Sequence, residues 1–145
     1  MVAPSHRKQW GIRQKMKMEK CLIKDNHRLY LIEDVNVAKH DSNLIVIQKN
    51  PSWANGKKSD STAGKVLKWA REHNFGKVIF LNLFSYITSK ADILDNNNLQ
   101  FFIHTETDGY IRKFIEENPS ATIVAAWGNN PKSVSKDDYD KRIRM

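Results

Sequence analysis

The stretch NLIVIQKNP, residues 43–51, decides the fold, because a run of leucine and β-branched side chains ends at an asparagine–proline pair. A continuous apolar run of this length is typical of a strand that is covered on both faces. Proline cannot donate a hydrogen bond to a neighbouring strand, and it keeps the preceding residue out of helical conformations. The stretch therefore predicts a buried strand over residues 43–49 that ends at Asn50-Pro51.

A helix and a second strand follow this first strand. After a polar loop over residues 52–60, apolar side chains recur at helical spacing and predict a helix over residues 61–74. Residues 77–84 contain the run Val-Ile-Phe-Leu and predict another buried strand. Because a strand, a helix and a strand of these lengths form a crossover connection, we expect the two strands to be parallel.

The remaining elements complete an α/β pattern. We expect a short strand at 28–33, at the sheet edge, and a third buried strand at 121–126. Residues 85–98 should form a loop with at most one helical turn, because three consecutive asparagines end it. Helices are expected at 105–117 and, short and charged, from about residue 135. The predicted fold is a three-layer α/β structure with a mostly parallel sheet of about four strands and helices on both faces.

Basic residues are concentrated at the start of the chain. The net charge is +8, and residues 1–20 hold six lysines and arginines against one glutamate. We therefore divide the chain into a basic arm or helix, residues 1–25, and a single α/β domain, residues 26–145. The arm could neutralise nucleic-acid phosphates, or it could be a solubilising end or an amphipathic helix that packs on the body. Its candidate phosphate-binding residues are Arg7, Lys8, Arg13, Lys15 and Lys17.

The composition excludes several classes of protein. The longest apolar runs, residues 44–47 and 78–81, are far too short to cross a bilayer, and no signal-peptide pattern follows the basic start. Cys21 is the only cysteine, which excludes an intrachain disulfide and a Cys-x-x-Cys metal site. We therefore expect a cytoplasmic protein that has no membrane association and no cofactor.

Two further kinds of site are disfavoured by local sequence. Residues 59–66 lack the first glycine and the final serine or threonine of a Walker phosphate-binding loop. His104, Glu106 and Asp108 alternate in a polar stretch, but acidic residues are also preferred in the first turn of a helix. The sequence therefore predicts no Walker-type nucleotide hydrolysis and no metal site.

Polar or aromatic residues follow each of the three predicted buried strands. In an open parallel α/β sheet, ligands bind beyond the carboxyl ends of the strands. Asn50, Asn82 and Trp127 lie at those ends, and Asp60 and Thr62 lie where the crossover helix begins. The amides could hydrogen-bond to a base edge or orient a water, and the indole could stack on a ring. Alternatively, the asparagines satisfy loop backbone groups, Asp60 is a helix cap and Trp127 covers the core.

Four motifs in order resemble a known family of bacteria and phages, catalogued as domain of unknown function sixteen forty-three. They are Asn50-Pro51-Ser52 with Ala54, Asp60 with Thr62, Asn82-Leu83-Phe84, and Ala126-Trp127-Gly128. The resemblance covers residues 28–130 and implies an architecture and a site but no reaction. A more distant similarity is to the uracil-DNA glycosylase fold. It implies that Asn50 orients or activates water, that Asn82 contacts a base edge, and that the arm holds phosphates beside an extruded base.

Three functions fit these observations. The first is a domain that binds a nucleotide or nucleic-acid base, with glycosylase-like hydrolysis at the carboxyl edge of the sheet. Its catalytic candidates are Asn50 and Asp60, and its ligand-binding candidates are Pro51, Ser52, Thr62, Asn82, Trp127 and Gly128. The second is a non-catalytic phage or bacterial accessory protein that binds nucleic acid or a protein, and the third is a small-nucleotide sponge or hydrolase. Residues 133–145 lack the histidine that glycosylases of this class usually carry there, so the sequence leaves open whether the protein is an enzyme.

Overall fold

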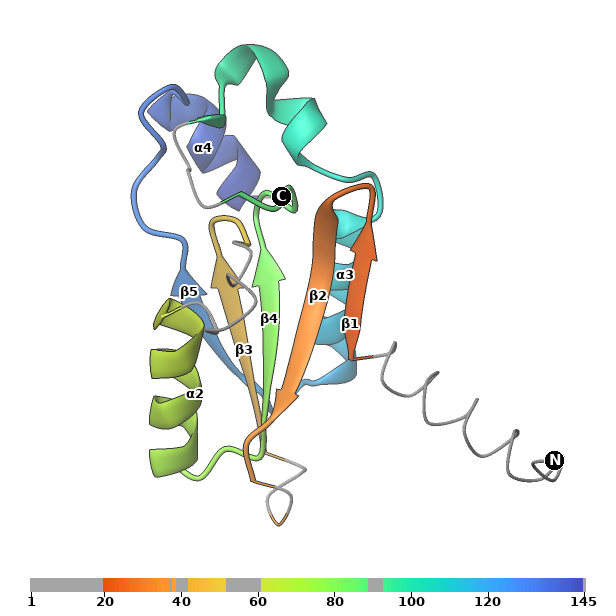
Figure 1. The fold of residues 1–145 in the computed structure, drawn as a ribbon, viewed down its shortest axis with the longest axis vertical. Helices are drawn as coiled ribbons and strands as arrows, with labels where there is room; N and C mark the ends of the chain where they lie inside the picture. Colours follow the sequence, from red (N-terminus) through yellow and green to blue (C-terminus); the bar gives the residue numbers. More distant parts are fainter. Residues whose placement is uncertain (1–19, 37, 39–41, 52–60, 89–92, 145) are drawn as a thin grey trace, which may run out of the picture.

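One mixed sheet organises the part of the chain that the structure describes (Figure 1). The computed structural model describes residues 20–36, 38, 42–51, 61–88 and 93–144. Five strands lie in the order β1-β2-β4-β3-β5. They are β1 (Cys21–Lys24), β2 (His27–Asp34), β3 (Asn43–Gln48), β4 (Lys77–Asn82) and β5 (Thr122–Ala126). The helices are α2 (Ser61–Glu72), α3 (Thr107–Glu117), α4 (Lys136–Ile143) and a 3-10 helix over Asn96–Phe102.

The three strands that the sequence predicts as buried form the parallel part of the sheet. β3 pairs in parallel with β4 on one side and with β5 on the other. The arrows of these three strands point the same way in Figure 1, so their carboxyl ends share one edge of the sheet. The predicted parallel strand, helix and strand over residues 43–84 are confirmed.

The other part of the sheet is antiparallel, which corrects the prediction of a mostly parallel sheet of about four strands. β2 pairs antiparallel with both β4 and β1. β1 comes from the segment that the sequence analysis placed in the basic arm, and it covers β2, which was expected at the edge. Asp25 and Asn26 join the two strands with φ angles of 51° and 63°, the left-handed pair that a tight hairpin turn requires.

The crossover helix α2 ends through a backbone motif at Asn74. This residue has a φ of 65°, a left-handed conformation that asparagine tolerates better than most residues. The Phe75 N–H donates to the Ala70 carbonyl at 2.9 Å, and the Asn74 N–H donates to the Arg71 carbonyl at 3.3 Å. This pair of bonds is a Schellman motif, which satisfies carbonyls that the helix end leaves free. The chain then enters β4 at Lys77.

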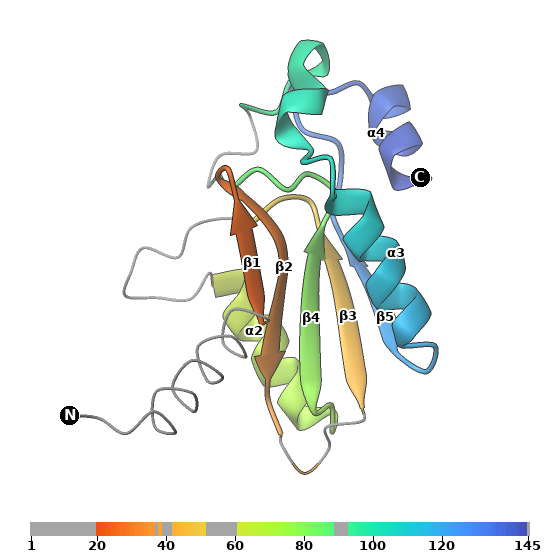
Figure 2. The ribbon, with the colours of Figure 1, turned by 90° about the vertical axis from the view of Figure 1, so that its right-hand side faces the viewer.

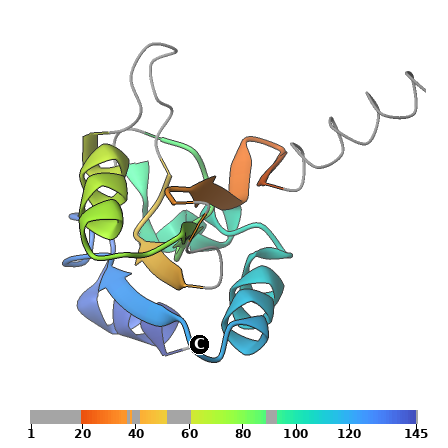
Figure 3. The same cartoon turned by 90° about the horizontal axis from the view of Figure 1, so that it is seen from below.

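Helices cover both faces of the sheet, as predicted (Figure 3). On one face, the side chains of Val46, Val78 and Phe80 form a buried cluster with Ala70 of α2. On the other face, the second and larger cluster contains Ile111 of α3, and its members from the sheet are Ile45, Ile47, Ile79 and Leu81. Adjacent residues of β3 and β4 therefore face opposite layers, because side chains alternate along a strand.

Two predicted elements differ from the structure. Residues 121–126 were expected as a buried strand, but β5 lies at the edge of the sheet and four of its five residues are exposed. The asparagines at 96–98 were expected to break helical structure, but they open the 3-10 helix. Asp95 makes this start possible, because its side-chain oxygen accepts a hydrogen bond from the Asn97 N–H at 2.9 Å.

The 3-10 helix and α4 lie above the carboxyl ends of the parallel strands (Figure 2). α4 begins as predicted near Ser135, whose hydroxyl accepts a hydrogen bond from the Asp138 N–H at 3.2 Å. Arg142 fixes the far end of α4, because its buried side chain donates from Nε to the Leu83 carbonyl at 2.7 Å. Within the described ranges, no helix is long and apolar enough to span a membrane.

Substitutions at a central and an edge strand should differ sharply in their effect on stability. Phe80 of β4 is 0% exposed and Ile123 of β5 is 47% exposed. We expect Phe80→Ala to lower the free energy of unfolding by about 3–5 kcal/mol, since it leaves a cavity between the sheet and α2. Ile123→Ala should cost less than about 1 kcal/mol. Urea denaturation measures both changes, and similar costs at the two positions would contradict the strand order.

Candidate ligand-binding site

Two carboxamides lie side by side at the carboxyl ends of β3 and β4. Gln48, the last residue of β3, pairs in register with Asn82, the last residue of β4. Both residues are buried, at 7% and 1% exposure. By strand alternation both side chains lie on the face that α2 covers, since Val46 and Phe80, two residues earlier, pack in the cluster on that face.

Within the part of the chain that the structure describes, the side chain of Asn82 is buried without hydrogen-bond partners. Neither its Nδ2 nor its Oδ1 makes a hydrogen bond, although both atoms are shielded from solvent. A buried polar group left in this state costs about 1–3 kcal/mol, because water no longer satisfies it. The amide offers two donor hydrogens and one acceptor oxygen to any ligand that reaches it. Asn82 is therefore the clearest candidate for ligand contact among the predicted residues that the structure describes.

Asn50 and Pro51 are held by the segment that follows β4. Asn50 Nδ2 donates to the Thr88 carbonyl at 2.7 Å and to the Pro51 carbonyl at 3.3 Å. The Thr88 N–H in turn donates to the Pro51 carbonyl at 2.8 Å, and Pro51 is buried. The amide nitrogen of Asn50 therefore satisfies loop carbonyls, which is the structural role that the sequence analysis set beside the catalytic one.

Trp127 lies on the opposite side of the sheet from Asn82. Its partly buried ring packs against the cluster on the α3 face, and its carbonyl accepts a hydrogen bond from the Tyr139 hydroxyl at 2.8 Å. Burial raises the pKa of Tyr139 to about 12, so the phenol remains a donor at neutral pH. Gly128 follows with a φ of 66°, which lets the chain turn away from β5. The structure therefore does not bring Trp127 and Asn82 into one site.

Several predicted residues fall outside the described part of the chain. They are Ser52, Asp60, the side chain of Thr62, and the basic residues Arg7, Lys8, Arg13, Lys15 and Lys17. The backbone of α2 begins at Ser61, and its amino end faces the carboxyl ends of the parallel strands in Figure 1. The first N–H groups of a helix have no partner within the helix and attract anions.

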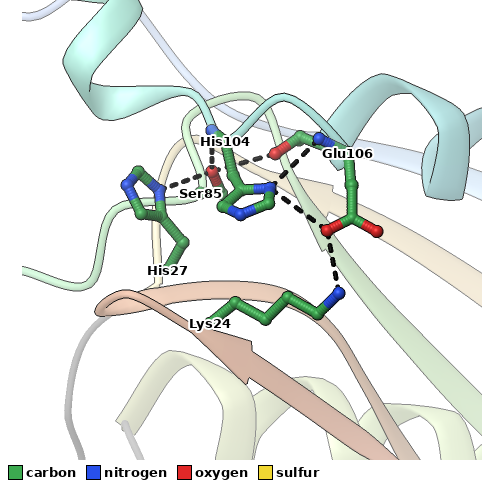
Figure 4. Close-up of polar contacts among 6 residues, drawn as sticks. Lys24, His27, Ser85, His104 and Glu106 are labelled. Carbon is green, nitrogen blue, oxygen red and sulfur yellow. Dashed lines mark hydrogen bonds and ion pairs between the residues drawn. The ribbon is translucent and has the colours of Figure 1, made fainter.

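A second polar group at this edge surrounds Ser85, which sequence reasoning did not identify (Figure 4). Ser85 is 0% exposed and lies three residues beyond Asn82. Its Oγ accepts hydrogen bonds from the His104 N–H at 2.8 Å and from the Thr107 hydroxyl at 2.9 Å. The Oγ lies 2.8 Å from Nδ1 of His27, which is itself buried. The only sequence signal was a serine directly after an apolar run, since its partners His27, His104 and Thr107 lie 58, 19 and 22 residues away.

The hydrogen bonds around Ser85 favour a neutral His27. A hydroxyl accepts two hydrogen bonds and donates one, so the Ser85 hydrogen is left to point at Nδ1 of His27. That nitrogen is then an acceptor and the imidazole is neutral. Burial, and after it the neighbouring His104, lowers the pKa of His27, while Asp25 opposes the shift. The network joins the β1–β2 hairpin, the end of β4 and the start of α3 without a solvent-accessible nucleophile.

The residues His104, Glu106 and Asp108 separate into two groups. Nδ1 of His104 accepts a hydrogen bond from the Glu106 N–H at 3.1 Å, and the Glu106 carboxylate pairs with Lys24 at 2.9 Å. This lysine lowers the pKa of Glu106. Asp108 instead lies 2.7 Å from the Arg142 guanidinium. Asp108 and Arg142 line a hollow of about 310 Å³ between the 3-10 helix, the start of α3 and α4, which contains both acidic and basic side chains.

The fold and these residues define an α/β domain with a mixed sheet and polar side chains at the carboxyl edge of its parallel strands. Among protein-family models, the family described as "Protein of unknown function (DUF1643)" matches residues 28–144. This match spans more than half of the chain, and the chain belongs to that family. Neither the curated proteins nor the solved structures contain a match.

His27 should make stability depend on pH. Because the pKa of His27 is lower in the folded protein than its ordinary value of about 6.5, the unfolded chain binds more protons below that pH. The free energy of unfolding should therefore fall as the pH falls below about 6.5 and through the folded pKa. Urea denaturation at pH 7.5 to 5 measures this fall.

Two histidine variants test the origin of this pH dependence. His27→Asn keeps an acceptor for Ser85 but cannot titrate, so its stability should fall less over the same range. His73, which directly follows α2 and is exposed, provides the control variant His73→Asn. An unchanged slope in His27→Asn would contradict the assignment of a neutral, buried His27.

Proposed function

We propose that this domain binds a nucleotide or a nucleic-acid base at the carboxyl edge of the sheet, on the face that α2 covers. The observation that carries this proposal is the buried Asn82 carboxamide with both polar atoms unpaired. A base edge presents donors and acceptors side by side, and one carboxamide complements such a pair. A ligand that satisfied both atoms would recover the free energy that their burial without partners costs.

The surroundings of Asn82 support a ligand with a polar edge and a phosphate. Gln48 provides a second carboxamide at the adjacent register position. The amino end of α2 faces the same edge, and free N–H groups at a helix start favour a phosphate. The basic residues of the arm, Arg7 to Lys17, would add salt-sensitive attraction to a nucleic-acid backbone. Together these features favour a nucleotide or nucleic acid over a neutral ligand.

Glycosylase-like hydrolysis is the catalytic form of this proposal, and it rests on the distant similarity of the Asn50-Pro51 and Trp127-Gly128 segments to the uracil-DNA glycosylase fold. Asn50 would orient a water through Oδ1, since its Nδ2 is bound to the Thr88 carbonyl. Asp60, as the only carboxylate within residues 52–64, would act as the base. The engaged amide of Asn50 equally suits a binding module without catalysis, such as a phage or bacterial accessory protein, and this is our second candidate function.

Asn82→Leu should separate a binding role from a structural one. Leucine has nearly the shape of asparagine without its polar atoms, so the free energy of unfolding should rise by about 1–2 kcal/mol. Binding of uracil-containing single-stranded DNA or of nucleotides should be lost at the same time. Urea denaturation and fluorescence anisotropy measure the two effects.

Asn118 offers a matched control at the opposite end of the sheet. Its Nδ2 donates to the Phe114 carbonyl at 2.7 Å and its Oδ1 accepts from Asn43 at 2.6 Å. Asn118→Leu should therefore lower stability by about 1–2 kcal/mol and leave binding unchanged. A destabilised Asn82→Leu protein that still binds nucleic acid would refute the proposed role of Asn82.

Asp60→Asn distinguishes hydrolysis from binding. If the parent protein releases uracil from single-stranded DNA, the substitution should slow release by about 100-fold or more, because a general base is removed. Affinity for the same DNA should change only slightly. Asp137→Asn on the exposed side of α4 is the control. A parent that binds this DNA but releases no base is a binding module, which excludes the catalytic form of the proposal.

A further inference from the structure

The edge strand β5 has the sequence of a central strand. Ile123, Val124, Ala125 and Ala126 are consecutive apolar residues, yet among the described strands β5 pairs only with β3. Ile123 is 47% exposed, and Val124 is the only residue of the strand that is partly covered. A strand of this composition normally has a neighbour on each side and a layer on each face.

β5 also lacks the features that protect sheet edges from pairing. Natural edge strands commonly carry lysine, proline or a bulge that prevents another strand from adding to the sheet. Thr122–Ala126 contains no charged residue and no proline, and its register with β3 is continuous from Leu44 to Gln48. The free backbone edge of β5 can therefore accept another strand.

A groove runs beside this edge, between α2 and the sheet. It measures about 330 Å³, and its floor contains Val46, Val124 and Ala126. Val66 and Trp69 of α2 form its wall, and Trp69 is 44% exposed. We call this feature the α2–β5 groove. It could accept apolar side chains from a strand that pairs with β5, because alternate side chains of that strand would point toward α2.

The charge around the groove indicates which kind of partner fits. Lys65 is the one charged side chain among the described residues that line it. α2 carries Lys65, Lys68 and Arg71 against a single acid, Glu72, and the whole chain has a net charge of +8. A second copy that paired through β5 would bring two basic chains together, whereas an acidic segment would be attracted.

We propose that β5 and the α2–β5 groove bind an extended, acidic segment of a partner protein, which adds a strand to the sheet. Backbone hydrogen bonds join the segment to the free edge of β5. Its apolar side chains enter the groove against Val124 and Trp69, and its carboxylates lie beside Lys65. This interaction goes beyond the proposed nucleotide or base binding, since it uses the outer edge of the sheet.

Two labelled peptides test the proposal. Both alternate valine with threonine, and one ends in two aspartates while the other ends in two lysines. Fluorescence anisotropy with the full chain should show saturable binding of the aspartate peptide, at least about fivefold tighter than the lysine peptide. Lys65→Glu should remove or reverse this preference. Lys113→Glu, on α3 at the other face of the sheet, should preserve it.

Trp69→Ala should weaken both peptides at least about fivefold, because a large aromatic wall of the groove is removed. Thermal melting shows whether each variant remains folded, which is expected at this exposed position. Absent binding of the aspartate peptide, or an unchanged preference in Lys65→Glu, would overturn the proposal. A dimer in sedimentation equilibrium that Val124→Lys dissociates would also overturn it, since the edge would then belong to a second copy.

Discussion

The parallel pairing of β3 with β4 is the constraint on which the rest of the structure depends. It starts at Asn43 beside Lys77 and continues in register to Gln48 beside Asn82. The register continues beyond the strands, because the Leu83 N–H donates to the Gln48 carbonyl at 2.9 Å. Both strands therefore end at the same level, and their final carboxamides share one face. β5 and α2 are positioned against this pair, and so are the site and the groove.

The burial of Asn82 lowers the stability of the fold at the residue that we propose contacts a ligand. An asparagine at the end of a central strand, 1% exposed and without a hydrogen bond, is less stable there than an apolar residue of the same shape. Ser85, three residues later, is equally buried, but its hydroxyl has three hydrogen-bond partners. The contrast within one short segment separates a polar group that holds the fold together from one that has no partner among the described residues.

The sequence predicts the centre of this fold better than its edges. Apolar runs at 43–49 and 77–84 are strong local signals, and both strands and the helix between them are confirmed. β1 could have been found from Asp25-Asn26, a turn that tolerates positive φ, but the basic residues around it favoured an arm. The exposure of β5 has no local signal, because pairing partners and not composition decide which strand lies at the edge.

The candidate site was also predicted only in part, because its geometry depends on how the strands pair. Strand ends located Asn50 and Asn82 at the carboxyl edge, but the face that each side chain occupies depends on register and alternation, which placed Trp127 on the opposite side. The Ser85 network joins residues from three distant segments, so no spacing could predict it.

The proposed function requires that the carboxamide of Asn82 contacts a base or a nucleotide. The most direct measurement is the side-chain amide signal of Asn82 in a nitrogen–proton NMR spectrum while free uracil and nucleoside monophosphates are added. We expect a saturable shift of this signal with at least one of these ligands, while the signal of the bonded amide of Asn118 stays in place. An Asn82 signal that none of them moves would contradict it.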